Sequence, residues 1–436
     1  MKSTASNPVP RMAQALVPRE MMSWALVSIC LAAVEGGVVG VLVKNLYTGV
    51  ASPLWVNVAV ALTSGAPAFA NILSFVFAVY AQGRDKVRLL TTLLTLFSIA
   101  TALIALAPQS AWGLLLLTVA MVAARVFWSA TLTVRAAVWR ANFPRRVRAR
   151  ITGQMGTLSS VVIAITSLLI GFLLDVAEDY FRWIWLFSAV AGVAAALVYR
   201  NAKVRGHRAM LRREQAQQTS VSLGQRLLEF KTVLGQDREF RDYMLGMFVF
   251  GSGNLMLLAP LIVIMNESFA LSRFDQVMIT STVALVAFAL SIPFWARLLD
   301  GSHIIEYRAR QCWAFVLAIL CYAVAAISQL EALLWLGSIT SGIAYAGGSL
   351  GWNLGHNDFT DDQKATLYMG IHVTLTGMRG LIMPPLGVLF YEWLKQPEIA
   401  MGNYALLLPL SLSFSGSCWF LYLRNRRRSQ TDVGAT

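Results

Sequence analysis

The feature that most limits how this chain can fold is a series of twelve long apolar segments. An α-helix needs about 20 residues to cross the hydrocarbon core of a bilayer. A membrane β-strand instead alternates apolar and polar residues over about 10 positions, whereas Leu114–Ala124 is interrupted by a single threonine. The pattern predicts an all-α polytopic membrane protein with twelve transmembrane helices. The segments are 21–44, 56–80, 89–107, 113–134, 155–175, 183–199, 244–265, 276–296, 312–328, 332–351, 370–391 and 404–423.

Composition supports this fold class. Only 13% of the 436 residues are charged, against about 25% in a typical soluble domain, so most of the surface must face lipid. The four cysteines lie in or beside apolar segments without paired spacing, which argues against a disulfide framework or a zinc site. The first 20 residues contain no apolar run. We therefore expect no cleavable signal peptide and a first helix that stays in the membrane.

The basic residues predict an orientation. Of 36 Lys and Arg residues, 30 fall in the tails and in alternate connections, four in the connections on the opposite side, and two inside apolar segments. Because basic connections favour the cytoplasm, we expect both termini to be cytoplasmic, in a bacterial inner (plasma) membrane. Anionic lipid of the inner leaflet is a sufficient partner for this charge, and no nucleic-acid partner is expected.

The longest polar connection divides the chain into two halves. Ala81 and Asp85 follow the second apolar segment as Ala296 and Asp300 follow the eighth, which suggests a duplicated six-helix unit. The predicted organisation is an N-terminal six-helix bundle (1–199), a cytoplasmic basic linker (200–243) and a C-terminal six-helix bundle (244–436).

Twelve helices, two related halves and a basic central linker resemble the major facilitator superfamily of transporters. The family carries Gly-x-x-x-Asp-(Arg/Lys)-x-Gly-(Arg/Lys)-(Arg/Lys) between its second and third helices. Here Asp85, Lys86 and Arg88 remain, but Ala81 replaces the first glycine of the motif and its second glycine is missing; Asp300 is a weaker counterpart in the second half. The resemblance covers the whole chain but does not identify a branch of the family.

Few charged residues lie inside the apolar segments: Glu35 in the first, Arg125 in the fourth and Arg379 in the eleventh. An ionised group at mid-bilayer is costly, so it usually faces a cavity or a partner. At about 1.5 Å per residue, Arg125 and Arg379 lie at similar depths. The resemblance implies that helices one, four, seven and ten line the transport path. The predicted cavity residues are Asn71, Asn254, Tyr345, Asn353 and Arg379.

These charges suggest proton coupling. We expect Glu35 to bind and release a proton, with Arg125 lowering the pKa of its carboxyl. The alternative is a static ion pair that joins helices one and four. Arg379 either faces the cavity or binds backbone carbonyls of a neighbouring helix. If both arginines face the cavity it is positive by one charge, which favours an anionic or zwitterionic substrate.

A gate at the cytoplasmic side is a further hypothesis. The connection between helices ten and eleven is acidic on a basic face, and its carboxylates would pair with arginines of the connection between helices four and five when the protein opens outward. A solvated loop is the alternative. His356 and Asp358 lack further metal ligands, so no metal site is predicted. The candidate gate residues are Asp85, Arg88, Arg145, Arg148, Asp300, Asp358, Asp361 and Asp362.

Together these patterns predict a secondary active transporter that moves a small solute by alternating access, coupled to protons and functioning as a monomer without a cofactor. An enzyme would need a nucleophile–base set or a metal cluster, and the sequence offers neither. A channel, or a substrate-sensing receptor on a transporter scaffold, is the alternative.

Overall fold

The protein is a bundle of long helices. The computed structural model describes residues 11–143, 145–177, 179–216, 223–269, 271–360 and 364–433. The first half contains α1 (Arg11–Ala33), α2 (Gly36–Tyr47), α3 (Pro53–Phe69), the 3-10 turn η1 (Ala70–Leu73), α4 (Ser74–Ala81), α5 (Lys86–Ala105), α6 (Ala111–Asn142), α7 (Arg145–Val176) and α8 (Tyr180–Arg200). The second contains α11 (Arg238–Ser268), α12 (Arg273–Val277), the π-helical turn η2 (Met278–Thr282), α13 (Val283–Asp300), α14 (Ile304–Ser328), α15 (Ala332–Leu354), the 3-10 turn η3 (Gly355–Phe359), α16 (Ala365–Leu394), the 3-10 turn η4 (Gly402–Tyr404) and α17 (Leu407–Val433).

The apolar segments lie within these helices except at residues 34–35, 106–107 and 405–406, and the all-α fold class is confirmed. In the described part of the chain, eleven helical spans are long and apolar enough to cross a membrane. The tenth predicted segment corresponds to α15, which has spanning length but is less apolar because glycine and serine recur along it. The helices also extend beyond several apolar segments, and α6 continues to Asn142.

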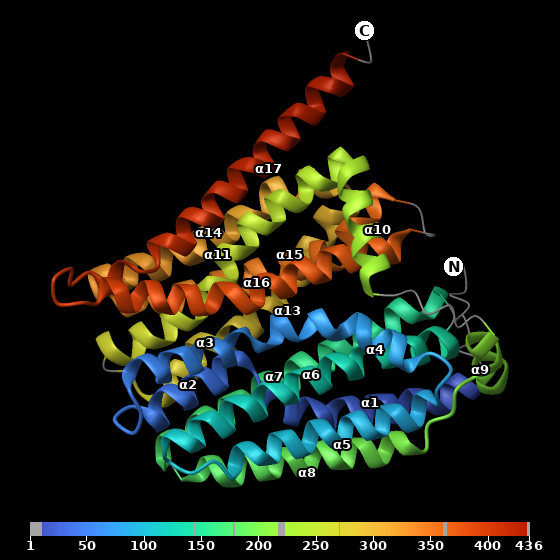
Figure 1. Ribbon diagram of the computed structural model, residues 1–436, viewed down its shortest axis with the longest axis horizontal. Helices are drawn as coiled ribbons and strands as arrows, with labels where there is room; N and C mark the ends of the chain where they lie inside the picture. The colour runs from blue at the N-terminus through green and yellow to red at the C-terminus, as the bar shows by residue number, and fades with distance from the viewer. Residues whose placement is uncertain are drawn as a thin grey trace, which may run out of the picture.

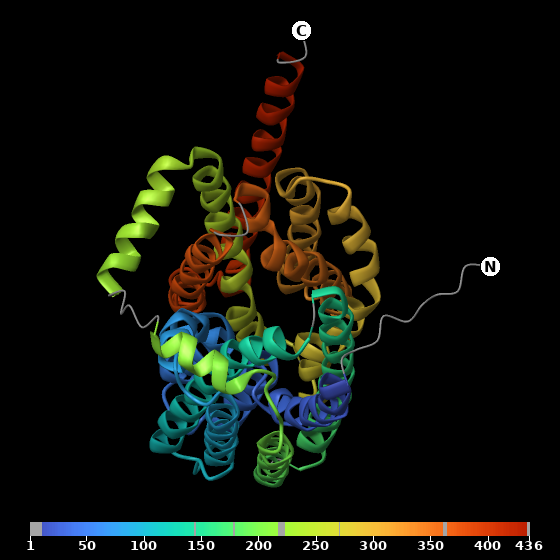
Figure 2. The ribbon, with the colours of Figure 1, turned by 90° about the vertical axis from the view of Figure 1, so that its right-hand side faces the viewer.

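The two halves lie side by side with their long helices running in the same general direction (Figure 1). We call the N-half α1–α8 and the C-half α11–α17. The connections 82–85, 201–206 and 301–303 lie at one end, here called the basic end, which faces the viewer in Figure 2. The connections 48–52, 106–110 and 395–406 lie at the other, here called the opposite end.

The first span is interrupted in its middle. Helix α1 ends at Ala33 and α2 begins at Gly36, and Glu35 between them has extended backbone angles (φ −69°, ψ 136°). Helix α1 packs on α7 and α8 within the N-half, whereas α2 packs on α3 and also contacts α11 and η2 of the C-half. The two parts of one span therefore belong to different packing environments.

The halves touch through a few helices. Helix α3 packs along α16, and α7 packs against α12 and η2. Helix α2 comes very close to η2 at Gly37, where a Cβ atom would lie 2.8 Å from the carbonyl oxygen of Thr280. A larger residue at Gly37 would force the two halves apart.

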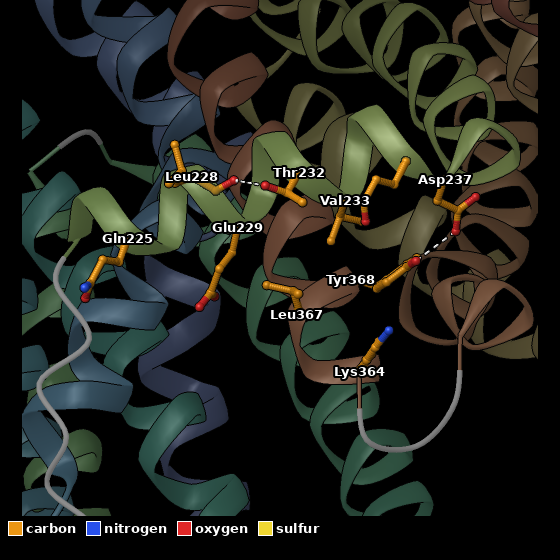
Figure 3. Close-up of a pocket in the computed structure, with 10 residues that line it drawn as sticks. Gln225, Leu228, Glu229, Thr232, Val233, Asp237, Lys364, Leu367 and Tyr368 are labelled. Carbon is orange, nitrogen blue, oxygen red and sulfur yellow. Dashed lines mark hydrogen bonds between the residues drawn. The ribbon is translucent and has the colours of Figure 1, made fainter.

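The linker forms two helices that attach to different halves. Helix α9 (His207–Ala216) is attached to the N-half by Glu214, which accepts hydrogen bonds from Lys86 Nζ (2.6 Å) and from the Gly83 amide (2.8 Å). Helix α10 (Leu223–Gln236) lies at the basic end along one side of the C-half, beside α11 and the start of α16 (Figures 1 and 2). Between α10 and the start of α16 lies a hollow where Tyr368 donates a hydrogen bond to Asp237 (Figure 3). The linker thus spans both halves at the basic end.

Candidate functional site

The predicted pair of Glu35 and Arg125 is present at the break in the first span. Arg125 Nη1 lies 3.9 Å from Glu35 Oε2, with side-chain exposures of 12% and 36% respectively. The break frees backbone groups from helical pairing, and Arg125 also donates to the carbonyl oxygen of Val34 (3.5 Å). Arg125 Nε is buried and has no hydrogen-bond partner among the residues that the structure describes. Glu35 is therefore a carboxylate within the span that remains open to solvent or solute and has one long ionic contact.

A polar cluster continues from this pair toward the basic end. Ser129 lies one helical turn after Arg125 on α6, and it donates to Asn71 Oδ1 (3.4 Å) and shares a hydrogen bond with Ser74 (2.9 Å). Asn71 lies in η1, shortly after Pro67, where the second span loses its α-helical hydrogen bonding. The cluster joins the second and fourth spans of the N-half beside the candidate site.

Helix α15 contributes exposed polar residues from the C-half. Tyr345 is 44% exposed and packs edge-on against Phe315, with ring centroids 4.9 Å apart. Tyr345 and Glu35 are near enough to interact electrostatically. Asn353 is exposed nearer the basic end and donates to the carbonyl oxygen of Ser349 (2.8 Å). Of the residues predicted to line the cavity, Tyr345 is therefore the one that the structure brings near Glu35 from the C-half.

Arg379 adopts the alternative considered for it, binding to helix backbone. It is 2% exposed, donates to the carbonyl oxygens of Met247 and Phe248 on α11, and donates to Thr376 Oγ1 (2.9 Å). A Cβ atom on Gly251 would lie 1.8 Å from Arg379 Nη1, so this glycine makes room for the guanidinium. Arg379 joins α16 to α11 inside the C-half.

Asn254 is also turned into the C-half. It is 8% exposed, and its Oδ1 accepts a hydrogen bond from Ser413 of α17 (3.3 Å). The contact joins α11 to α17, so this amide oxygen is already bonded within the bundle.

At the opposite end, an ion-pair cluster joins the halves, and the sequence analysis did not anticipate it. Lys44 of α2 is 3% exposed in its side chain and lies 2.6 Å from Glu267 of α11. Its Nζ also donates to Asn57 (2.7 Å), and Glu267 is bound by Lys395 and by Tyr391 (2.8 Å). We call these five residues the end latch. The signal in the sequence was the presence of Lys44 and Glu267 at the edges of otherwise apolar segments.

A second unpredicted charge pair lies inside the N-half. Glu20 of α1 and Arg135 of α6 are both fully buried and approach to 3.5 Å. Tyr199 donates to Glu20 (2.8 Å), and the Arg135 guanidinium donates to Ser23 (3.0 Å) and lies over the rings of Trp24 and Tyr199. The sequence analysis counted Arg135 as a connection residue and did not consider Glu20, because both lie one residue outside the apolar segments.

The candidate gate residues make contacts within their own half or the linker. Asp85 caps α5 by accepting from the amides of Val87 and Arg88, and it lies 3.4 Å from His207 of α9. Asp358 accepts from the Ile304 amide (2.7 Å) at the start of α14.

Two further candidate gate residues have no contact with the other half among the described residues. Arg88 and Asp300 are exposed. Asp361 and Asp362 lie outside the described residues, as do the side chains of Arg145 and Arg148. The predicted pairing of the acidic loop with the arginines therefore stays a prediction. No group of three or more potential metal-ligating side chains occurs among the described residues.

Comparison with known proteins identifies the family. A sequence model of the major facilitator superfamily matches residues 24–300. The chain belongs to this superfamily. No curated protein sequence gives a significant match to it. Membership makes the chain an integral membrane transporter, and it confirms the resemblance found in the sequence.

Solved structures share the fold at low sequence identity. The D-xylose-proton symporter has 12% identity and a TM-score of 0.69, covering 93% of this chain and 97% of its own. The inward-open xylose transporter XylE from E. coli has 9% identity and a TM-score of 0.67, with coverages of 94% and 95%. The nucleoside transporter NupG has 12% identity and a TM-score of 0.61, with coverages of 95% and 99%. These likenesses extend the shared fold over nearly the whole chain.

Proposed function

We propose that this superfamily member is a secondary active transporter that couples movement of a small polar solute to a proton carried by Glu35. The observation that carries the proposal is the position of this carboxylate. It lies at the break in the first span, is 36% exposed, and has one long contact to Arg125. A carboxylate within a span is functional more often than not, because burying it for structure alone is costly.

The pair offers a simple coupling scheme. While Arg125 is close, its guanidinium is the ionic partner of the Glu35 carboxylate. A solute group that binds Arg125 weakens that contact, so the carboxylate binds a proton more readily. Release of the solute restores the pair and expels the proton. Coupling of this kind needs only that the solute and the carboxylate share the same guanidinium.

The structure alters the expectation about solute charge. Because Arg379 binds backbone carbonyls of α11, it adds no charge to the exposed site, and Glu35 and Arg125 form a balanced pair. A balanced pair suits a zwitterionic or uncharged polar solute better than an anion. Tyr345 supplies an aromatic face and a hydroxyl beside the pair from the C-half.

We further propose that the basic end faces the cytoplasm and that the described state is open inward. Basic connections favour the cytoplasmic side. The ion pairs and side-chain hydrogen bonds that join the halves in the described residues involve the middle and opposite-end portions of the helices, such as Lys44–Glu267 and Asn57–Glu392. Two structures of similar fold, XylE from E. coli and a bacterial Spinster homologue, are described as inward open and inward facing.

The test is transport by purified protein in liposomes, with labelled amino acids, small peptides, sugars and nucleosides. We expect a proton gradient to drive accumulation of one class by the unaltered protein. Glu35→Gln should abolish accumulation but retain gradient-independent exchange of solute across the membrane. Glu331→Gln is the matched control, since Glu331 is exposed at the opposite end and its carboxylate accepts a hydrogen bond from Trp335 of the helix that follows it.

Two outcomes would contradict the proposal. Accumulation by the Glu35→Gln variant that still responds to the proton gradient would exclude Glu35 as the proton carrier. Uptake by the unaltered protein that never exceeds equilibration, with any of the solutes and with either gradient direction, would exclude active transport of those solute classes.

A further inference from the structure

A basic hollow lies on the outer flank of the N-half, at the basic end. Its volume is about 620 Å³, and it is bounded by the first turns of α5, the last residue of α8 and the connection that leads into α9. Three cationic side chains line it, Arg88, Arg200 and Lys203, together with the hydroxyl-bearing Thr91 and Thr92. We call it the flank pocket.

The cations of the flank pocket are unpaired. Arg88, Arg200 and Lys203 are exposed, and none of them has an ion pair or side-chain hydrogen bond in the described part of the chain. The one carboxylate in the lining, Asp85, is bound to the α5 amides and to His207. Three positive charges thus converge on a hollow that holds one negative charge, and that charge is already bonded.

A second hollow at the same end shows that such pairing is available to this protein. There Arg426 pairs with Asp242 at 3.1 Å and Arg427 with Glu239 at 2.7 Å. These ion pairs hold the end of α17 against α11. The absence of comparable carboxylate partners for the cations of the flank pocket means that their positive charge remains available to a ligand.

The flank pocket lies beside the lipid-facing surface rather than the path between the halves. Helices α5 and α8 form the edge of the N-half farthest from the C-half (Figures 1 and 2). Leu197, one helical turn before Arg200, is 58% exposed, and Val190 on the same helix is 66% exposed. An apolar strip on α8 therefore leads directly into the basic hollow.

We propose that the flank pocket binds the phosphate of an anionic phospholipid in the leaflet at the basic end, with the acyl chains lying along α8. Arginine guanidinium groups match phosphate oxygens in geometry and can donate two parallel hydrogen bonds. Lys203 adds a point charge beside them. The adjacent apolar strip favours a lipid over a soluble phosphate, because a soluble ion gains nothing from exposed leucine and valine side chains.

Occupation of the flank pocket would also hold the linker. The residues from Ala202 to Val204 form one wall, and the chain continues from them into α9, which is attached to the N-half through Glu214 and the buried Lys86. A bound headgroup therefore bridges α5 and the connection into α9, and reinforces the attachment of the linker to the N-half.

The test is native mass spectrometry of the full chain in detergent with added phosphatidylglycerol or phosphatidylcholine. We expect phosphatidylglycerol to bind more tightly. Arg88→Gln combined with Arg200→Gln should weaken its binding about 25-fold, at about five-fold per cation. The control is Arg426→Gln combined with Arg428→Gln, which also removes two positive charges at the basic end, but from ion-paired side chains. Binding of phosphatidylglycerol should be unchanged in this control. Lys203→Gln alone should weaken it about five-fold, which gives a second reading if the double variant is unstable.

Three results would overturn the proposal. Equal binding of the two lipids by the unaltered protein would show no anionic headgroup site. An equal loss in the control variant would show that total charge rather than the flank pocket controls binding. Displacement of bound phosphatidylglycerol by millimolar inorganic phosphate would identify a site for soluble phosphate instead.

Discussion

Removing the charge of Lys44 should open the opposite end of the protein. Lys44 Nζ lies 2.6 Å from Glu267 and 2.7 Å from Asn57, and its side chain is 3% exposed. Methionine at this position keeps a similar length and removes the charge and all three donors. Lys44 and Glu267 lie on different halves. We therefore expect their contact to stabilise the state in which the halves meet at the opposite end, and to be lost when the halves separate there.

The magnitude follows from the contacts that are lost. Breaking a fully buried pair costs about 3–5 kcal/mol, but Glu267 is 20% exposed and keeps Lys395 and Tyr391 as partners. A hydrogen bond to a charged group contributes about 1.5–3 kcal/mol. We therefore expect Lys44→Met to destabilise the state with the contact by about 2 kcal/mol relative to the state without it. That corresponds to about a 30-fold shift in the equilibrium, since about 1.4 kcal/mol is tenfold. A 1:99 ratio of outward-open to inward-open molecules would become about 1:3.

Spin labels at the opposite end measure this shift. Cysteines replacing the exposed residues Val50 and Met401 report the separation of the halves, in a background with Cys418, the one exposed cysteine, changed to serine. Lys44→Met should add a population at longer distance. Arg182→Met is the control, since Arg182 is a cation at the same end that donates within the N-half to Ala105. An unchanged distance distribution, or an equal change in the control, would refute the reasoning.

Two further predictions concern stability, measured as thermal unfolding in detergent. Gly251→Ala should lower the free energy of unfolding by about 1–3 kcal/mol, because its Cβ would overlap the Arg379 guanidinium. Gly153→Ala, where no atom lies within 4 Å of the added carbon, should be neutral or slightly stabilising. Equal melting temperatures for the two variants would refute the overlap. Arg135→Met should lower the free energy of unfolding by about 3–5 kcal/mol, because it leaves the buried Glu20 without its cation. Adding Glu20→Gln should recover part of that stability. A lower melting temperature for the double variant than for Arg135→Met would contradict a paired role.

The sequence was most informative where one local pattern decides the structure. Long apolar runs can cross a bilayer only as helices, so the positions of the spans followed directly. The pairing of Glu35 with Arg125 was also predictable, because both charges lie inside apolar segments and have few other partners. The break between α1 and α2 was not predicted, although Glu35 is followed there by Gly36 and Gly37, and glycine favours interruption of a helix.

Other parts of the candidate site depended on packing between distant segments. Whether Arg379 faces a cavity or a neighbouring helix is decided by the missing side chain of Gly251 on α11, and apolar pattern alone does not reveal this contact. The charges of the end latch and of Glu20 and Arg135 lie at segment edges, where a hydropathy pattern cannot separate a helix end from a connection. Their burial follows from helices that extend past the apolar core and pack on one another.

The interrupted first span has a mechanical consequence. Helix α1 is held by α7 and α8, while α2 packs mainly on α3 of the same half and also lies against α11 and η2 of the other half. Rotation of one half against the other therefore acts directly on α2 but not on α1, and Val34 and Glu35 are the residues that can absorb a change in the angle between them. Glu35 would thus act as a joint in the backbone as well as an acid–base group. We expect the relative movement of the two halves to shift the Glu35 carboxylate with respect to Arg125 even when no solute is bound.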